Sequence, residues 1–413
     1  MMNHMLEVDR SVPALLVRTG VPMWDYGALA TVRSLGRLGV DVHALAMPGE
    51  RELLTSRYLK GVVGAPLDPA DDVGRTVARL NGAVAVIGAR CVAIAGDDES
   101  AVLLAEQREA IEARLLTAEV PGFLPRSLSD KVSLGVLAAA ADVPYPPFVH
   151  SEDVDRLADF AHRTGVPLVA KSPAPFTRLK DSAVTKTTVI HDLADLDVFM
   201  EAAREGYRIF LQKYLTGSGG QTWYAAGVSS GAEVRVWTGR KMLDYPAQTG
   251  IGVMNVARPN EAIVGQVSNF VRSIGYLGAF DTDWVSDSTT GQTYLIDFNP
   301  RRGAQFRTFQ THDGLDVVRG LHLALTAGRL PNGEQDFGLV HTVENLALLR
   351  GAAGLPWRYR DNGLPIEYSW YARDDPAPAR AIAEQTVRRL RRKVRQRFAR
   401  RRSVTSAFGR RGV

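Results

Sequence analysis

Residues 293–303 read TYLIDFNPRRG, and this stretch says most about the fold and the chemistry of the chain. The apolar start, TYLI, predicts a largely buried β-strand. Side chains two positions apart share one face of a strand, so Asp297 and Asn299 present two oxygen ligands together. Pro300 ends the strand, and Arg301 can then direct a forked donor toward a phosphoryl oxygen or a carboxylate. A buried carboxylate is costly without a metal or cation, so we expect one here.

A second segment, FDTDWVS at 280–286, precedes this strand and carries Asp281 and Asp283. Asp283 can supply a third oxygen ligand from a neighbouring strand. Mg²⁺ is typically held by one or two carboxylates while phosphate oxygens complete its octahedron, so we predict that Asp283, Asp297 and Asn299 bind Mg²⁺. The alternative is a solvated hairpin in which the same charges merely pair with one another.

The surrounding sequence predicts antiparallel strands covered on one face. Apolar and polar positions alternate in segments 223–229, 232–239, 280–286 and 293–300. A helix is expected over residues 260–275, between the second and third of these strands.

The N-terminal part predicts an α/β domain that ends near residue 120. Residues 14–46 read as strand, helix and strand, with Gly39 as the helix stop. The first turn lacks the three glycines of a dinucleotide fingerprint, which argues against NAD binding. Segments 83–88 and 92–96 are predicted as further strands, and residues 100–116 as a helix.

The middle of the chain predicts a small α+β lobe. Ser129 or Asp130 can cap a helix whose first turn contains Lys131. Strands are expected at 166–171, 184–190 and 208–215, with a helix at 193–204. The first of these strands ends in Lys171. Either lysine alone would usually be a solvated side chain, and only their place in a set makes them notable.

Composition indicates a globular protein of several modules and excludes a disulfide scaffold. The chain has 413 residues, of which 45% are hydrophobic and 23% charged, and Cys91 is its only cysteine. The single cysteine suits a reducing cytoplasm, where we expect the protein. The sequence begins without a basic stretch followed by an apolar run and contains no window of about 20 consecutive apolar residues, so we expect no signal peptide and no membrane span. The net charge of +5 comes from residues 388–411, which contain twelve Arg or Lys and no acid. Such a tail could contact RNA or an anionic membrane.

The residues above, taken in order, resemble a known family. The set comprises Lys131, VAK ending at Lys171, LQKYL at 211–215, Asp283, and DFNPR at 297–301. It resembles the ATP-grasp superfamily, most closely the carboxylate-amine ligases and more distantly biotin carboxylase and D-alanine:D-alanine ligase. The resemblance covers about residues 12–330. It implies an α/β and α+β ATP-grasp fold with an N-terminal βαβ domain.

The resemblance also implies the roles of individual residues. Lys131 and Lys171 would contact the phosphates of ATP, and adenine would bind the backbone of the hinge residues Gln212, Lys213, Tyr214 and Leu215. Arg301 would stabilise the reacting phosphate, with Mg²⁺ held by the three predicted ligands. Arg302 and Arg307 are our candidates for gripping a substrate carboxylate, because guanidinium matches that group with two parallel hydrogen bonds. Solvation at the surface is their alternative role.

These implications predict an ATP- and Mg²⁺-dependent ligase. It would join a small-molecule carboxylate, activated as an acyl phosphate, to an amine, with amino acids as the substrates. The family commonly has glutamate where Asp297 stands, and the lid segment 172–186 contains no glycine. These departures leave open a regulatory ATP-binding protein without turnover. A nucleic-acid- or membrane-binding protein that acts through its basic tail is the other alternative. The oligomeric state also stays open, with a homodimer as one option.

The expected organisation has five parts. They are an N-terminal domain (1–120), a small lobe with its lid (121–216), a catalytic lobe (217–330), a C-terminal extension (331–387) and the basic tail (388–413).

Overall fold

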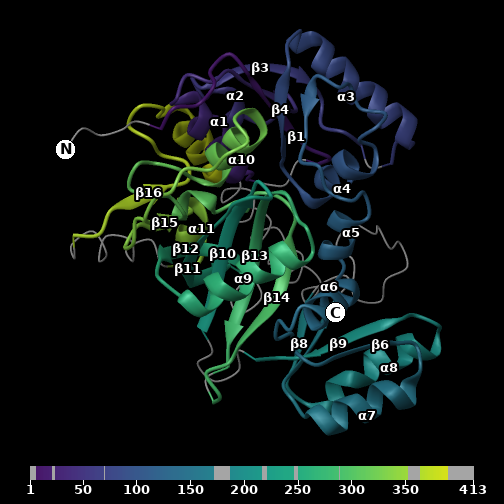
Figure 1. The fold of residues 1–413 in the computed structure, drawn as a ribbon. Helices are drawn as coiled ribbons and strands as arrows, with labels where there is room; N and C mark the ends of the chain where they lie inside the picture. Colours follow the sequence, from purple (N-terminus) through teal and green to yellow (C-terminus); the bar gives the residue numbers. More distant parts are fainter. Residues whose placement is uncertain are drawn as a thin grey trace, which may run out of the picture.

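The computed structural model describes residues 6–20, 24–68, 70–171, 187–215, 221–245, 250–287, 289–351 and 363–388 (Figure 1). These ranges form three sheets of five, four and seven strands. In Figure 1 the five-stranded sheet lies at the top, the seven-stranded sheet in the centre and the four-stranded sheet at the lower right. None of the helices in these ranges is long and apolar enough to cross a membrane.

The N-terminal sheet is parallel, with strand order β3-β2-β1-β4-β5. Its strands are β1 (Ala14–Val17), β2 (Val42–Leu45), β3 (Leu59–Gly64), β4 (Cys91–Ala95) and β5 (Leu115–Leu116). Its helices are α1 (Tyr26–Gly36), α2 (Arg51–Leu54), α3 (Val73–Ile87) and α4 (Asp98–Glu106). Asp25 caps α1 by accepting a hydrogen bond from the Ala28 N–H, and Gly39 adopts a positive φ of 84° after the helix. The predicted βαβ opening is confirmed.

Two predictions in this domain were wrong. Residues 83–87 lie in α3 rather than in a strand, because Val77, Leu80 and Val84 follow helical spacing on one buried face while Val86 is exposed. A short apolar run cannot distinguish a strand from the buried side of a helix. The helix predicted over 100–116 is shorter in the structure and ends at Glu106. Leu115 and Leu116, the last two residues of the predicted range, form β5 instead.

The small lobe is an antiparallel sheet with order β6-β9-β7-β8. Its strands are β6 (Phe148–Ser151), β7 (Leu168–Lys171), β8 (Thr188–Ile190) and β9 (Ile209–Lys213). Its helices are α7 (Val154–Thr164), η1 (Leu193–Leu196) and α8 (Asp197–Arg204). Two helices that precede it, α5 (Leu124–Ser129) and α6 (Lys131–Ala140), pack with α9 (Glu261–Ser273) against the central sheet. Asp130 caps α6 by accepting a hydrogen bond of 2.8 Å from the Ser133 N–H, as predicted. The first residues of the strand predicted at 184–190 lie outside the described ranges.

The central sheet has strand order β14-β13-β10-β11-β12-β15-β16. Its strands are β10 (Gln221–Ser229), β11 (Val234–Tyr245), β12 (Ile251–Ala257), β13 (Gly278–Ser286), β14 (Thr293–Asn299), β15 (Val340–Thr342) and β16 (Ile366–Tyr368). The helices that accompany it are α9 (Glu261–Ser273), η2 (Phe306–Thr308), α10 (Val317–Thr326) and α11 (Glu344–Leu349). Residues 377–388 are also helical. The predicted antiparallel pairing of β10, β11, β13 and β14 is confirmed.

The two faces of this sheet have different partners. Helix α9 packs on one face through Ile263, Val267 and Phe270, against the apolar side chains of β13 and β14. On the other face, part of the sheet packs with α10 and α1 into a core shared with the N-terminal domain. The small lobe lies beside the lower end of β13 and β14 in Figure 1. A polar site can therefore form on the face opposite α9.

His341 on β15 predicts how stability depends on pH. Its ring is buried, and burial lowers its pKa to about 4 from an ordinary value of 6.5. The folded state therefore favours the neutral ring, so the stability that His341 contributes is complete above pH 6.5 and is lost as the pH falls toward 4. We expect this loss to reach about 3 kcal/mol, and His341→Gln to remove it.

Urea unfolding at pH 7, 6 and 5 measures this effect. The matched control is His312→Gln, because the His312 side chain is 65% exposed. An equal pH dependence in the wild type and in His341→Gln would contradict the prediction.

Candidate active site

The candidate site begins with the register of β13 and β14. In this antiparallel pair Asp283 lies opposite Asp297, and Asp281 lies opposite Asn299. Because side chains two residues apart share a face, all four project from the face opposite α9. The structure thus brings together the three predicted metal ligands. Asp281, which was not predicted as a ligand, joins them.

The carboxylates of this group differ in their electrostatic surroundings. Burial raises the pKa of Asp283 to about 6, with Lys241 opposing the shift and Asp297 reinforcing it. Burial and the neighbouring Asp283 also raise the pKa of Asp281. Burial would raise the pKa of Asp297 too, but the ion pair with Lys131 outweighs it, so that pKa is lowered. Additional positive charge near Asp281 and Asp283 would therefore be favourable.

These residues fit a magnesium ion that arrives with a nucleotide. Asp283 Oδ1 is buried and has no hydrogen-bond partner. Within the described ranges, no group of three or more His, Cys, Asp or Glu side chains is arranged to hold a metal by itself. Two carboxylates and the amide oxygen of Asn299 nevertheless suit Mg²⁺, because phosphate oxygens usually supply its remaining ligands.

Two lysines, one on α6 and one on β7 of the small lobe, approach the acids. Lys131, in the first turn of α6, forms an ion pair with Asp297. Lys171 ends β7, and its Nζ lies 5.6 Å from the centre of the Phe210 ring. Burial, reinforced by Lys131, lowers the pKa of Lys171 to about 8. An ammonium group held this way would gain from a nearby anion such as a phosphate.

A cavity of about 250 Å³ lies where these groups meet. Side chains of the small lobe and of the central sheet line it, among them Lys131, Lys171, Gln212, Lys213, Tyr214, Leu215, Thr222, Lys241, Asp283 and Asp297. The two lysines and the four hinge residues predicted to bind ATP therefore line a single cavity, together with Asp283 and Asp297. Asn299 and Arg301 do not line it.

Lys241 is a charged residue of this cavity that the sequence prediction missed. It lies on β11, and its Nζ donates a hydrogen bond of 3.1 Å to the Gly250 carbonyl and lies 5.4 Å from the Tyr224 ring centre. The strand was expected to end at Gly239, whereas β11 continues to Tyr245. Gly239 lies opposite Tyr224, which lies opposite Asp283. Extending the two-residue alternation from Gly239 would therefore have placed Lys241 on the face of the sheet that carries Asp283.

The predicted hinge follows β9 at the edge of the cavity. The backbone N–H of Lys213 donates to the Pro147 carbonyl at 2.9 Å, and that of Tyr214 donates to the Pro167 carbonyl at 3.1 Å. These bonds fix the path of the segment. The lid segment 172–186 and residues 216–220, which follow the hinge, lie outside the described ranges.

The three predicted arginines have three different environments. Arg301 lies 3.1 Å from Asp98 (Nε to Oδ1) and donates a hydrogen bond of 3.0 Å to Asn299 Oδ1. Arg302 is only 2% exposed, and its Nε and Nη2 have no hydrogen-bond partner. Burial lowers the pKa of Arg302 to about 10. An anionic ligand would compensate this buried guanidinium.

Arg307 is placed differently from Arg302. Its Nη1 lies 2.6 Å from Asp316 Oδ2 and its Nε 3.1 Å from Glu367 Oε1. The two carboxylates raise the pKa of Arg307 despite its burial. Because its guanidinium is already paired on two sides, Arg302 is the better candidate for a substrate carboxylate.

Arg301 and Arg302 also face the N-terminal domain at a position that favours ligand binding. The strand order of that domain reverses between β1 and β4, and open α/β sheets bind ligands beyond the carboxyl ends of strands at such a point. Asp98 begins α4, three residues after the end of β4, and Asp25, in the segment that follows β1, lies 4.0 Å from Arg302. The acids and arginines therefore extend the site from the ATP-side cavity toward this point.

Comparison with family profiles and with curated protein sequences gave no match. Solved structures, in contrast, include clear neighbours. Biotin carboxylase from Campylobacter jejuni has a TM-score of 0.60 at 14% identity, with 80% of this chain and 74% of that chain covered. N5-carboxyaminoimidazole synthetase from Staphylococcus aureus, complexed with ADP, has a TM-score of 0.59 at 16% identity, with 79% and 80% covered.

L-amino acid ligase from Bacillus licheniformis is a third neighbour, with a TM-score of 0.57 at 16% identity and 77% and 75% of the two chains covered. Likeness at this level of identity concerns the backbone arrangement. It agrees with the fold that the order of lysines, acids and arginines predicts, and the chain has the ATP-grasp fold.

Proposed function

We propose that this protein is an ATP- and Mg²⁺-dependent carboxylate-amine ligase. The observation that supports the proposal most is the meeting of Asp283 and Asp297 with Lys131 and Lys171 at one cavity. Two acids for a metal and two lysines for phosphates are the groups that phosphoryl transfer from MgATP requires. The neighbours solved with nucleotides, among them the ADP complex, have the same fold.

Each predicted ligand of MgATP has a role in this proposal. Asp283, Asp297 and Asn299 would hold Mg²⁺, which supplies charge neutralisation at the phosphates. Lys131 and Lys171 would bind phosphate oxygens, and Lys131 would exchange Asp297 for them. The backbone of Gln212 to Leu215 would bind adenine, through groups other than the Lys213 and Tyr214 N–H, which already donate to carbonyl groups.

The proposed reaction has two steps. A substrate carboxylate oxygen attacks the γ-phosphorus of ATP, the bond to the β–γ bridging oxygen breaks, and ADP leaves. An amine then attacks the carbonyl carbon of the acyl phosphate, inorganic phosphate leaves, and the amine loses a proton to give an amide or peptide bond. Arg301 would stabilise the reacting phosphate and Arg302 would bind a substrate carboxylate. No covalent enzyme intermediate is needed.

We propose amino acids as the substrates. Arg302 presents a buried guanidinium whose Nε and Nη2 have no hydrogen-bond partner, which suits a carboxylate. One neighbour with the same fold is an L-amino acid ligase. We also propose a cytoplasmic location, which suits the buried free thiol of Cys91. A homodimer remains an option for the assembly.

ADP formation with a panel of amino acids and dipeptides, followed by mass spectrometry of the products, tests the function. We expect ADP release that requires both a carboxylate and an amine. Asp283→Asn should lower this rate by at least on the order of 100-fold, because it removes a charged ligand from the metal. The control is Asp41→Asn, because the Asp41 side chain is 53% exposed in an ion pair with Lys60.

Three results would count against the proposal. ATP binding without substrate-dependent ADP release would favour the regulatory alternative. Turnover of Asp283→Asn equal to that of the wild type would remove the metal assignment. Equal losses in Asp283→Asn and Asp41→Asn would mean that the assay responds to charge in general.

Lys171 yields a separate prediction about nucleotide affinity. Lys171→Ala should weaken ATP binding by about 1 to 3 kcal/mol, roughly 5- to 150-fold in Kd, because a charge-assisted hydrogen bond to phosphate is lost. Calorimetric titration with ATP measures this change. Lys60→Ala is the matched control, since the Lys60 side chain is 56% exposed. An ATP affinity of Lys171→Ala equal to that of the wild type would refute the assignment.

The basic tail belongs to the proposal as an electrostatic tether. Its twelve Arg or Lys within residues 388–411 have no acid among them, and all but the first residue of this segment lie outside the described ranges. The last described residues form a helix that contacts the N-terminal domain, through Gln385 to Trp24 and Glu384 to Arg51. We propose that the tail binds anionic surfaces, with RNA and acidic lipid as the two options.

Truncation before Arg388 tests the tether. We expect an unchanged rate with small substrates and lost retention on either RNA or anionic vesicles, whichever the full chain binds. That binding should weaken steeply with salt, because each neutralised phosphate releases counterions. Loss of ATP turnover on truncation would show that the tail belongs to the folded body.

A further inference from the structure

Helix α1 connects the substrate side of the candidate site to the C-terminal part of the chain. At its start, Asp25 Oδ1 lies 4.0 Å from Arg302 Nη2. Gly27, in the first turn, lies so close to Arg302 that a Cβ there would collide with the guanidinium group, and it would also lie 2.9 Å from Ala304 Cα. The position of α1 therefore determines where the Arg302 guanidinium can lie.

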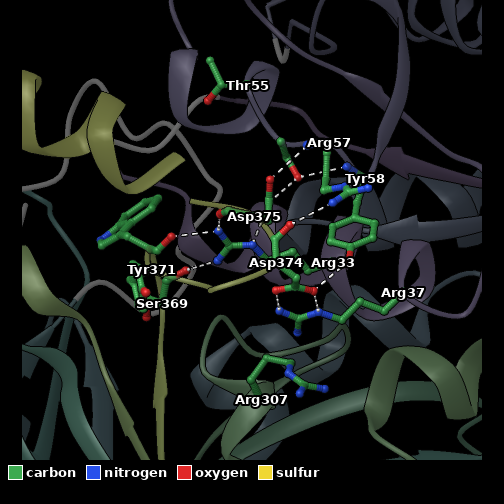
Figure 2. A network of polar contacts seen from close by, with 12 residues as sticks. Arg33, Arg37, Thr55, Arg57, Tyr58, Arg307, Ser369, Tyr371, Asp374 and Asp375 are labelled. Carbon is green, nitrogen blue, oxygen red and sulfur yellow. Dashed lines mark hydrogen bonds and ion pairs between the residues drawn. The ribbon is translucent and has the colours of Figure 1, made fainter. Parts of the chain in front are cut away.

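The later part of α1 is held by residues 369–375, as Figure 2 shows. Arg33 donates from Nε to Asp375 Oδ2 at 2.9 Å and from Nη2 to the Asp375 carbonyl at 2.8 Å. It also donates from Nη1 to the Ser369 carbonyl at 3.1 Å and from Nη2 to the Trp370 carbonyl at 2.8 Å. One side chain of α1 thus makes four hydrogen bonds to a single C-terminal segment.

The same segment has further contacts with the N-terminal domain. Asp375 accepts hydrogen bonds from Ser56 Oγ at 2.7 Å and from the Arg57 N–H at 3.0 Å. The Trp370 ring packs edge-on against Tyr26, with 6.1 Å between the ring centres. Residues 369–375 therefore contact α1 in its first turn as well as at Arg33.

Burial distinguishes this network from the ion pair next to it. Arg33 and Asp375 are 4% and 1% exposed. Removing one member of a buried pair leaves the other charge without compensation inside the protein. The Arg37–Asp374 pair, also drawn in Figure 2, is partly exposed, at 25% and 41%, but it is bidentate, with hydrogen bonds of 2.9 Å and 3.0 Å, and it also ties α1 to residues 369–375. The control is therefore Lys60→Ala, outside this network, because the Lys60 side chain is 56% exposed.

We propose that residues 369–375 are a positioning element for substrate recognition: they hold α1 through Arg33, and α1 holds Arg302 in place for the substrate carboxylate. This inference rests on the proposed function. Arg33 and Asp375 are positioning residues, since neither lines the ATP cavity. Gly27 and Arg33 are six residues apart on one helix, about 9 Å at the usual rise, so a shift at Arg33 is transmitted to the first turn.

Kinetics separate this role from a contribution to ATP binding. In Arg33→Lys and Asp375→Asn we expect the KM for the carboxylate substrate to rise on the order of tenfold, with the KM for ATP within about twofold of wild type. Lys60→Ala should change neither. Equal increases in both KM values, or unchanged values in both positioning variants, would overturn the inference.

Amide hydrogen exchange tests the same inference without requiring turnover. In Arg33→Lys and Asp375→Asn, the peptide covering residues 24–30 should exchange on the order of tenfold faster, while the peptide covering residues 209–215 keeps its wild-type rate. Lys60→Ala should leave both peptides unchanged. If the wild type forms no ADP, the proposed function fails, and exchange still decides whether residues 369–375 hold α1.

Two exchange results would overturn the inference. Wild-type rates at residues 24–30 in both positioning variants would show that α1 does not depend on the network. Faster exchange throughout the molecule, or failure of both variants to fold, would show that the network supports the whole fold rather than the substrate side.

Discussion

The pairing register of β13 and β14 is the constraint on which the candidate site depends. With Asp283 opposite Asp297 and Asp281 opposite Asn299, three carboxylates and an amide share one face, while Trp284 and Phe298 lie in the core beneath α9. A slip of one residue in either strand would exchange these sets, placing acids in the core and aromatic rings in the site. The apolar core against α9 therefore also specifies where the polar site can form. Packing and function depend here on the same alternation of residues.

The site contains buried acids and lysines whose charged forms a bound metal and nucleotide would stabilise. Lys131 compensates Asp297, whereas Asp283 keeps a buried oxygen without a partner, and burial lowers the pKa of Lys171. Mg²⁺ would favour the charged forms of the acids, and phosphate groups would favour the charged lysines. On the other side of Asn299, Arg301 links these residues to Asp98 and so to the N-terminal domain. The proposed metal ligands Asp297 and Asn299 thus lie on β14, and the arginines proposed to act on the phosphate and the substrate follow this strand directly after Pro300.

Local patterns in the sequence predict much of this arrangement and fail where the structure depends on distant contacts. Alternation in β13 and β14, the Asp130 cap and the βαβ opening follow from short-range rules, and the fold agrees with them. Residues 83–87 were misassigned because a short apolar run has no distinctive period, and Lys241 was missed because β11 is longer than expected. The pairing of Arg307 and the network of Arg33 depend on tertiary structure. Arg33 and Asp375 are 342 residues apart, and no local pattern joins them.

A structure of the protein with Mg²⁺ and a non-hydrolysable ATP analogue tests the central claim most directly, because it locates the metal and the phosphates relative to these side chains. The account predicts one Mg²⁺ bound by Asp283, Asp297 and Asn299 together with phosphate oxygens. It also predicts that Lys131 leaves Asp297 for a phosphate, that Lys171 contacts a phosphate oxygen, and that adenine lies against residues 212–215. A nucleotide bound elsewhere, or a metal held without Asp283 and Asp297, would contradict the account.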